Sequence, residues 1–433
     1  MPRLRWVVIF GLAPLLLAGT IAGYLFAMTP VDAKTLPVTS DLAKRLRAHV
    51  QYLASPELKG RKPGTAGNRE AAEYIQARFR EMGLESLPSL RGYGQRISSE
   101  LGDNLIGVRP AATAGPSPRW VLIGAHYDHL GGSYLGADDN ASAVAILLET
   151  ARLLPPLAHD HMLFVAFNAE EPPYIRTPLM GSQYFVDHLP PEIGSPANLQ
   201  AVVIMDLMGG VHWDPLREVI FAAGAEKSPG LYRRLKEAGG RDALRVTRDA
   251  EHQPFQPVTR HRSPVTGLTV LPVGMHLVEE VPLVGQVSFS DYDAFRNATV
   301  PFVFLSAGRT PRYHQTTDLP DTLHYERMAA TVGWLQTLLE LIDQDQEPYR
   351  FEANRLEFAD EVASLRPLVA WAADKKMMIP RTSALSMWKL RRDHEWLKVL
   401  ESTAPTKEDL KRLESLSIRL QCLLADFPAC FLL

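Results

Sequence analysis

The feature that most constrains the fold is an alternation of short apolar strands and helices that begins at Asn104. Apolar runs predict strands at residues 120–125, 162–167, 202–205 and 300–305. Helical patterns follow at residues 141–154, 181–188 and 323–342. Strands separated by helices imply βαβ units and a mostly parallel sheet. We therefore predict an α/β protein with three layers, α/β/α.

Two further helices precede this alternation. Residues 40–54 place Leu42, Leu46, Val50 and Leu53 on one helical face, and a second amphipathic helix runs from Asn68, as its cap, to about residue 82. The glycine-rich loop at residues 59–67 lies between them. It lacks the preceding strand and the Lys-Ser/Thr ending of a phosphate-binding loop, so we interpret it as a shaped structural loop.

The chain divides into three regions. Residues 35–345 are predicted to form the main α/β domain, in which the proline-rich segment 251–286 is interpreted as an irregular insertion. Residues 346–433 are charged and helical, most clearly at 390–400 and 407–424, and are predicted to form a C-terminal helical appendage. Residues 1–34 carry Arg3 and Arg5 before an uncharged, mostly apolar run at 6–28.

This leader has the layout of a signal peptide and is also long enough to be a membrane anchor, since a spanning helix needs ~20 apolar residues. We expect export to the periplasm or the extracellular space, with membrane attachment only if the leader is not cleaved. The net charge of −3 offers no electrostatic basis for a nucleic-acid partner. The only two cysteines, Cys422 and Cys430, are interpreted either as a disulfide or as buried small side chains.

Residues of metal-ligand type follow each predicted strand. They are His126, Asp139, Glu171, Asp206 and His314. Parallel strands direct such residues to one crevice at their carboxyl ends. Two histidines and three carboxylates can hold two zinc ions ~3.5–4 Å apart if one carboxylate bridges them. The sequence therefore predicts a two-zinc hydrolase.

Two neighbouring residues complete the predicted chemistry. Glu170, beside a ligand, is positioned to act as the general base that takes a proton from the attacking water. Asp128 can accept the second N–H of His126 and hold its imidazole in place. A lone histidine is usually solvent-facing or hydrogen-bonded, and this interpretation is given to His129, His159, His161, His212 and His276.

From about residue 50 to residue 341 the sequence resembles the zinc exopeptidases, which include bacterial leucyl aminopeptidases, aminopeptidase Y, glutamate carboxypeptidases and glutaminyl cyclases. The resemblance rests on the segments LASPELKGR (53–61), GTAGN (64–68), NLIGV (104–108), DNAS (139–142) and GSQYF (181–185), and on the pair Glu170-Glu171. It ends before the C-terminal appendage.

The resemblance implies a role for each site residue. It assigns His126, Asp139 and Asp206 to one zinc, and Asp139, Glu171 and His314 to the other. It makes Asp139 the bridge, Glu170 the catalytic base and Asp128 the partner of His126. The sequence departs from the family at Ser290-Asp291-Tyr292, where a histidine is common in the third position. Tyr292 is accordingly predicted to bind substrate by donating to the developing oxyanion, and the alternative is that it only packs.

An aminopeptidase acting on peptides is the expected function, and three alternatives stay open. A glutaminyl cyclase would use one zinc. A carboxypeptidase would need a cation for the terminal carboxylate, for which Arg309 and Arg312 are candidates. A non-catalytic receptor or scaffold would have lost ligands. The oligomeric state cannot be read from the sequence.

Overall fold

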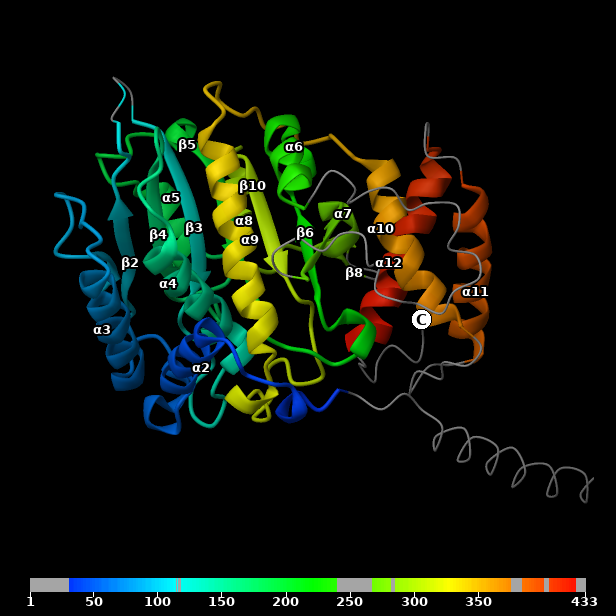
Figure 1. Ribbon diagram of the computed structural model, residues 1–433, viewed down its shortest axis with the longest axis horizontal. Coiled ribbons are helices and arrows are strands. Elements are labelled where there is room, and N and C mark those ends of the chain that lie inside the picture. The colour runs from blue at the N-terminus through cyan, green and yellow to red at the C-terminus, as the bar shows by residue number, and fades with distance from the viewer. Residues whose placement is uncertain are drawn as a thin grey trace, which may run out of the picture.

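The centre of the protein is one eight-stranded sheet (Figure 1). The computed structural model describes residues 31–113, 115, 118–239, 267–281, 285–374, 384–400 and 405–425. The sheet has the order β1-β2-β4-β3-β5-β10-β6-β7. Its strands are β1 (Gly94–Ser98), β2 (Gly102–Arg109), β3 (Trp120–His126), β4 (His161–Phe167), β5 (Leu199–Met205), β6 (Val219–Ala223), β7 (Thr269–Val273) and β10 (Phe302–Ser306). A small antiparallel pair, β8 (Glu280–Val281) and β9 (Gly285–Gln286), lies outside it.

The four central strands, β4, β3, β5 and β10, run parallel to one another. Strands β3 and β5 are buried along their whole length, as expected for strands covered on both faces. The pairings of β1 with β2, β2 with β4 and β6 with β10 are antiparallel, so the sheet is mixed. The predicted α/β class is confirmed.

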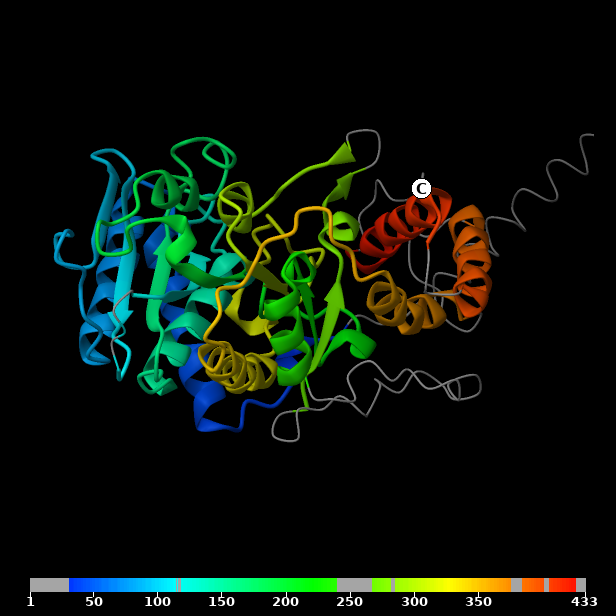
Figure 2. The same cartoon turned by 90° about the horizontal axis from the view of Figure 1, so that it is seen from above.

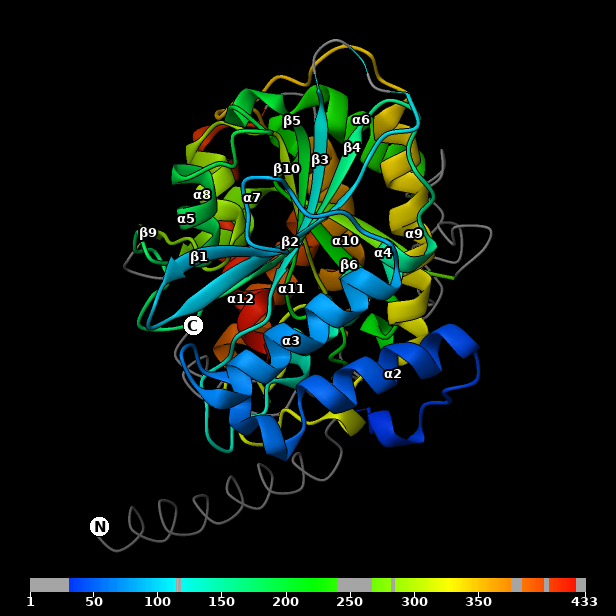
Figure 3. The same cartoon turned by 90° about the vertical axis from the view of Figure 1, so that its left-hand side faces the viewer.

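Helices cover both faces of this sheet. One face carries α2 (Asp41–Leu53), α3 (Ala66–Glu81), α4 (Ala143–Leu153), α6 (Pro229–Ala238) and α9 (Tyr325–Asp343). The opposite face carries α5 (Gly181–Asp187) and α8 (Tyr292–Asn297). Viewed along the sheet, these two sets lie on either side of the strands (Figure 3). The three predicted layers are therefore present.

Two sequence-based assignments need correction. The cap of α3 is Thr65, whose side chain accepts from the N–H of Asn68. Asn68 itself lies inside the helix. The segment expected to be an irregular insertion contains β7 and the short helix α7 (Met275–Glu279). Pro272 argues against a strand when the sequence is considered alone. Proline is nevertheless tolerated in a strand at the edge of a sheet, which is where β7 lies.

The described part of the C-terminal region contains three helices, α10 (Phe358–Ala373), α11 (Ala384–Val399) and α12 (Lys407–Ala425). They share their own apolar core and pack beside β7 and α7, at one end of the molecule (Figure 2). A buried ionic contact supports this arrangement. His276 of α7 lies 3.1 Å from Glu361 of α10 through Nε2 and 3.1 Å from Glu414 of α12 through Nδ1. The predicted helical appendage is confirmed.

Most of the predicted leader, residues 1–30, lies outside the described part of the chain. Among the residues that the structure describes, no helix is both long enough and apolar enough to cross a membrane. Cys422 in α12 is disulfide-bonded, which favours the bridge over two separate buried thiols. The other cysteine, Cys430, lies outside the described residues.

Candidate metal centre

The predicted ligands meet at the carboxyl edge of the parallel strands. His126 is the last residue of β3, and Asp206 directly follows β5. Glu171 comes in the loop after β4, and Asp139 lies in the turn that leads into α4. His314 follows β10 by a short loop. Parallel strands end at one crevice, so the fold itself gathers these five side chains.

Within the crevice, Asp139 faces two groups at once. Its Oδ1 lies 3.3 Å from Nε2 of His126, and that same nitrogen is 3.6 Å from Oδ1 of Asp206. Its Oδ2 lies 3.2 Å from Nε2 of His314, which is also 3.2 Å from Oε2 of Glu171. The two oxygens of one carboxylate therefore point to different sets of ligand atoms, which is the geometry that a bridging ligand needs.

His129 is a site residue that sequence reasoning missed. It was interpreted as an ordinary polar histidine, yet it is fully buried with Nδ1 only 2.7 Å from Oε1 of Glu171. It is 3.9 Å from Oδ2 of Asp139, and the three residues form a group compact enough to hold an ion. Its position in the loop directly after β3, close to His126, is the signal that could have identified it.

The chemistry of these atoms fits a bound metal. Nε2 of His126, Oδ1 of Asp206 and Nε2 of His314 are all buried without a hydrogen bond. Buried polar atoms are normally satisfied, so a cluster of unsatisfied ones that face each other calls for a missing partner. Imidazole nitrogens and carboxylate oxygens are ligands that zinc accepts.

Glu170 lies beside this cluster and belongs to neither group. Its Oε2 is 3.8 Å from Nε2 of His126, and its Oε1 is buried without a hydrogen bond. Burial raises the pKa of the Glu170 carboxyl well above its usual range, and the charges of Glu171, Asp206 and Asp291 raise it further against the opposing effect of His126. A carboxyl group with a raised pKa is suited to exchanging protons near neutral pH.

Asp128 connects the two halves of the site. Its carboxylate accepts the backbone N–H groups of Glu170 and Glu171, at 3.1 and 3.2 Å. Nδ1 of His126 lies 3.6 Å from that carboxylate and 3.2 Å from the main-chain oxygen of Asp128. Asp128 therefore fixes the path of the Glu170-Glu171 backbone as well as bordering the imidazole.

Comparison with known proteins agrees with this geometry. The model of peptidase family M28 matches residues 104–337, more than half of the chain and all five predicted ligands. The chain belongs to peptidase family M28. The resemblance drawn from the sequence is thereby confirmed at the level of the family, and the protein is a peptidase-type hydrolase. The C-terminal helices lie beyond the matched residues.

Individual relatives of this M28 peptidase are distant. The uncharacterized protein YfbL of Escherichia coli is 27% identical over 284 residues, covering 62% of this chain and 79% of that protein. Aminopeptidase YwaD of Bacillus subtilis is 30% identical over 168 residues, covering 37% of this chain and 34% of YwaD. The structure of the LapA aminopeptidase of Legionella pneumophila superposes with a TM-score of 0.51 at 17% identity, over 70% of this chain and 73% of LapA, and shows a shared fold.

Residues outside the ligand set hold the ligand loops of the M28 peptidase in place. Arg61, from the glycine-rich loop, is fully buried and donates to the carbonyls of Leu53, Tyr127, Leu135 and Gly136. Asp318 accepts the N–H groups of Asp138 and Asp139, at 2.8 and 3.1 Å. The loop interpreted as structural therefore shapes the site, and Asp318 fixes the turn that carries the bridging residue.

The segment Ser290-Asp291-Tyr292 divides between the site and the core. Ser290 donates to Oδ2 of Asp206 at 3.0 Å, and burial raises the pKa of the Asp291 carboxyl to about 7. Tyr292, in contrast, is fully buried, stacks on Phe302 and donates its hydroxyl to Glu279 at 2.8 Å. This position fits the alternative that Tyr292 only packs, and it does not fit the prediction that Tyr292 binds substrate.

Proposed function

We propose that this M28 peptidase is a two-zinc aminopeptidase. The observation that carries the proposal is the division of the ligand atoms into two groups that share Asp139. His126, Asp139 and Asp206 would hold one ion, and Asp139, Glu171 and His314 the other, with His129 against Glu171. A single-zinc cyclase would need only one of these groups.

In this proposal the chain positions the reacting groups. Bound zinc would polarise the scissile carbonyl and make the attacking water more acidic. Glu170 would take the proton of that water on its free carboxylate oxygen and deliver it to the departing amine. Asp128 would hold the backbone of Glu170 and Glu171 in place, because its carboxylate accepts a hydrogen bond from the N–H group of each.

The charge of the site favours the amino end of a peptide. Carboxyl groups at or beside the cluster are Asp128, Asp139, Glu170, Glu171, Asp206 and Asp291. When all six are ionised, two divalent ions would neutralise four of their negative charges, and the remaining charge would attract an ammonium group. The name of YwaD, an aminopeptidase, points the same way.

A carboxypeptidase is the second candidate, and one observation favours it. Arg309 is exposed beside the site, with its guanidinium 4.8 Å from the ring centroid of Tyr313 and 5.4 Å from that of Phe289. A cation so placed can receive a terminal carboxylate. Substrates blocked at one end or the other separate the two functions.

We expect the purified protein to bind two zinc ions per chain and to release residues from free amino termini. Elemental analysis and a panel of aminoacyl amides, amino-blocked peptides and N-terminal glutaminyl peptides would measure both. Chelation should abolish turnover, and added zinc should restore it. At most one ion per chain together with cyclisation of glutaminyl peptides would establish the cyclase instead, and cleavage of amino-blocked peptides alone would establish the carboxypeptidase.

We also propose that the protein acts outside the cytoplasm, in the periplasm or beyond the cell, with anchoring by residues 6–28 if they are retained. Two features support this: Arg3 and Arg5 precede an apolar run, and Cys422 is disulfide-bonded. Recovery of the protein from the cytoplasmic fraction, with its N-terminus intact, would contradict export.

A further inference from the structure

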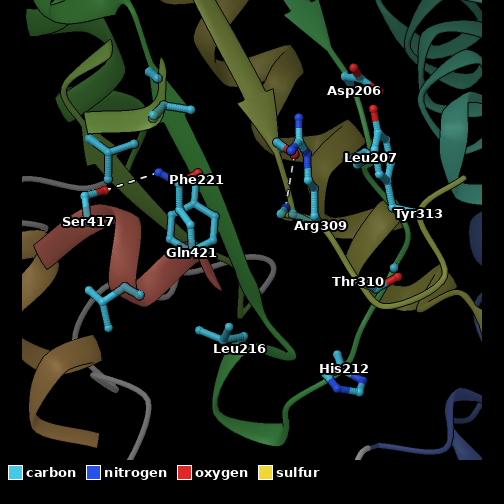
Figure 4. Close-up of a pocket in the computed structure, with 18 of the residues that line it drawn as sticks. Asp206, Leu207, His212, Leu216, Phe221, Arg309, Thr310, Tyr313, Ser417 and Gln421 are labelled. Atoms are coloured by element: carbon cyan, nitrogen blue, oxygen red, sulfur yellow. Dashed lines mark hydrogen bonds between the residues drawn. The ribbon is translucent and has the colours of Figure 1, made fainter. Parts of the chain in front are cut away.

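A cavity of about 380 Å³ opens beside the metal centre. Asp206, a proposed zinc ligand, forms part of its wall. Tyr313, whose ring stacks on that of His314 with centroids 3.9 Å apart, forms another part. Figure 4 shows both residues on one side of the cavity. The cavity therefore borders the metal centre, at Asp206 and beside His314.

The opposite wall comes from the C-terminal helices. Ser417, Ile418, Leu420 and Gln421 of α12 line the cavity, together with residues of α10. Figure 4 shows Ser417 and Gln421 across the cavity from Tyr313. This wall lies outside the residues that match the family model, so it is a feature of this chain's appendage.

Specific contacts hold α12 in that position. Ser417 Oγ and Gln421 Nε2 both donate to the carbonyl of Leu277 in α7, at 2.7 and 2.8 Å. One turn earlier, Glu414 meets the buried His276 at 3.1 Å. Ser417 and Gln421 also line the cavity. The contacts with α7 therefore attach α12 to the catalytic domain at the cavity itself.

The lining of the cavity is mainly apolar. Leu216, Phe221 and Val273 come from the catalytic domain and face the helical wall. The buried guanidinium of Arg327 donates hydrogen bonds to the carbonyls of Gly210 and Met208. Burial lowers the pKa of His212 to about 4, so its imidazole is neutral at neutral pH. Asp206 and Arg309 are the other charged residues of the lining, and Arg309 is exposed. Most of the lining would therefore offer apolar atoms to an apolar group.

We propose that the C-terminal helices, which lie outside the residues that match the family, close the far side of this cavity and so set how large an apolar side chain of the substrate's terminal residue it accepts. The proposal rests on the proposed function, because it takes the metal centre as the place where the scissile bond lies. The cavity falls in the range of ~300–1,000 Å³ that is usual for pockets that enclose a small ligand. Its volume can therefore accommodate a large side chain.

The proposal is tested by filling the cavity from its helical wall. Ile418 is half-buried and lines the cavity, so Ile418→Trp places a large ring in it. Ser415→Trp is the matched control, because Ser415 is exposed on the same helix and does not line the cavity. The substrates are amides of alanine, leucine, phenylalanine and 2-aminooctanoic acid.

For the unaltered protein, kcat/KM should rise about fourfold for each methylene group that becomes buried. Ile418→Trp should lower the ratio of kcat/KM for 2-aminooctanoyl amide to that for alanyl amide at least about tenfold, whereas Ser415→Trp should leave this ratio unchanged. An unchanged ratio in Ile418→Trp, or an equal change in both variants, would overturn the proposal. If Ile418→Trp does not fold, Ile418→Phe adds a smaller ring at the same position of the wall.

Different measurements test the proposed function and the proposed role of the cavity. Zinc content and turnover of alanyl amide test the proposed function, whereas the ratio between large and small substrates tests only the cavity. If no aminoacyl amide is cleaved, calorimetric binding of 4-phenylbutylamine to the zinc-loaded protein tests the cavity directly. Binding that is lost in Ile418→Trp and retained in Ser415→Trp would support the cavity, and binding equal in both would overturn it.

Discussion

Replacing Glu170 by glutamine should slow turnover by about 10²–10⁴-fold, the usual contribution of general acid–base catalysis. The amide keeps the size of the side chain and cannot accept a proton as the carboxylate does. Because Glu170 belongs to neither ligand group, zinc content and substrate affinity should stay near those of the unaltered protein. Steady-state kinetics with elemental analysis of the same sample would measure both.

The adjacent residue provides the control. Glu171→Gln removes a charged oxygen that lies 3.2 Å from Nε2 of His314 and weakens the contact to His129. This variant should therefore lose zinc from the second group, and added zinc should partly restore its activity. A zinc-loaded Glu170→Gln enzyme with near-normal turnover would remove the proposed role of Glu170 and leave the metal centre standing.

Replacing Asp139 by alanine should remove zinc from both positions, because its two oxygens face the two ligand groups. The loss of affinity should exceed the ~10–100-fold that follows removal of a residue that only orients a ligand. Turnover should fall to background. Elemental analysis and a zinc titration monitored by calorimetry would show whether one ion or both are lost. Loss of only one would contradict the bridging role.

The neighbouring Asp138 is the matched control for this second experiment. Its carboxylate accepts the N–H groups of Gly209 and Gly210, both at 2.8 Å, and belongs to no ligand group. Asp138→Ala should keep both ions and lower the free energy of unfolding by about 1–3 kcal/mol for each buried donor left unsatisfied. Thermal unfolding in the presence of a chelator separates this effect from that of zinc binding. Zinc loss in Asp138→Ala equal to that in Asp139→Ala would show that the turn as a whole, and not one carboxylate, controls the metals.

The sequence by itself determined the fold class and the residues that gather at the site. Fully buried parallel strands are continuous apolar runs, so β3, β4, β5 and β10 were recognisable without a structure. The carboxyl ends of parallel strands meet at one edge, which brings residues as distant as His126 and His314 together. Both inferences depend on local patterns and on the topology that they imply, and neither needs side-chain coordinates.

Only the tertiary structure decided which side chains face the centre and what closes the pocket. Tyr292 and His129 are both polar residues near the site in the sequence, yet one points into an aromatic core and the other against Glu171. Nor could local patterns show that Arg61 fastens the loop after β3, or that α12 reaches the cavity beside Asp206. The direction of a side chain and the docking of a remote helix depend on packing between distant segments, which periodicity and motif spacing do not encode.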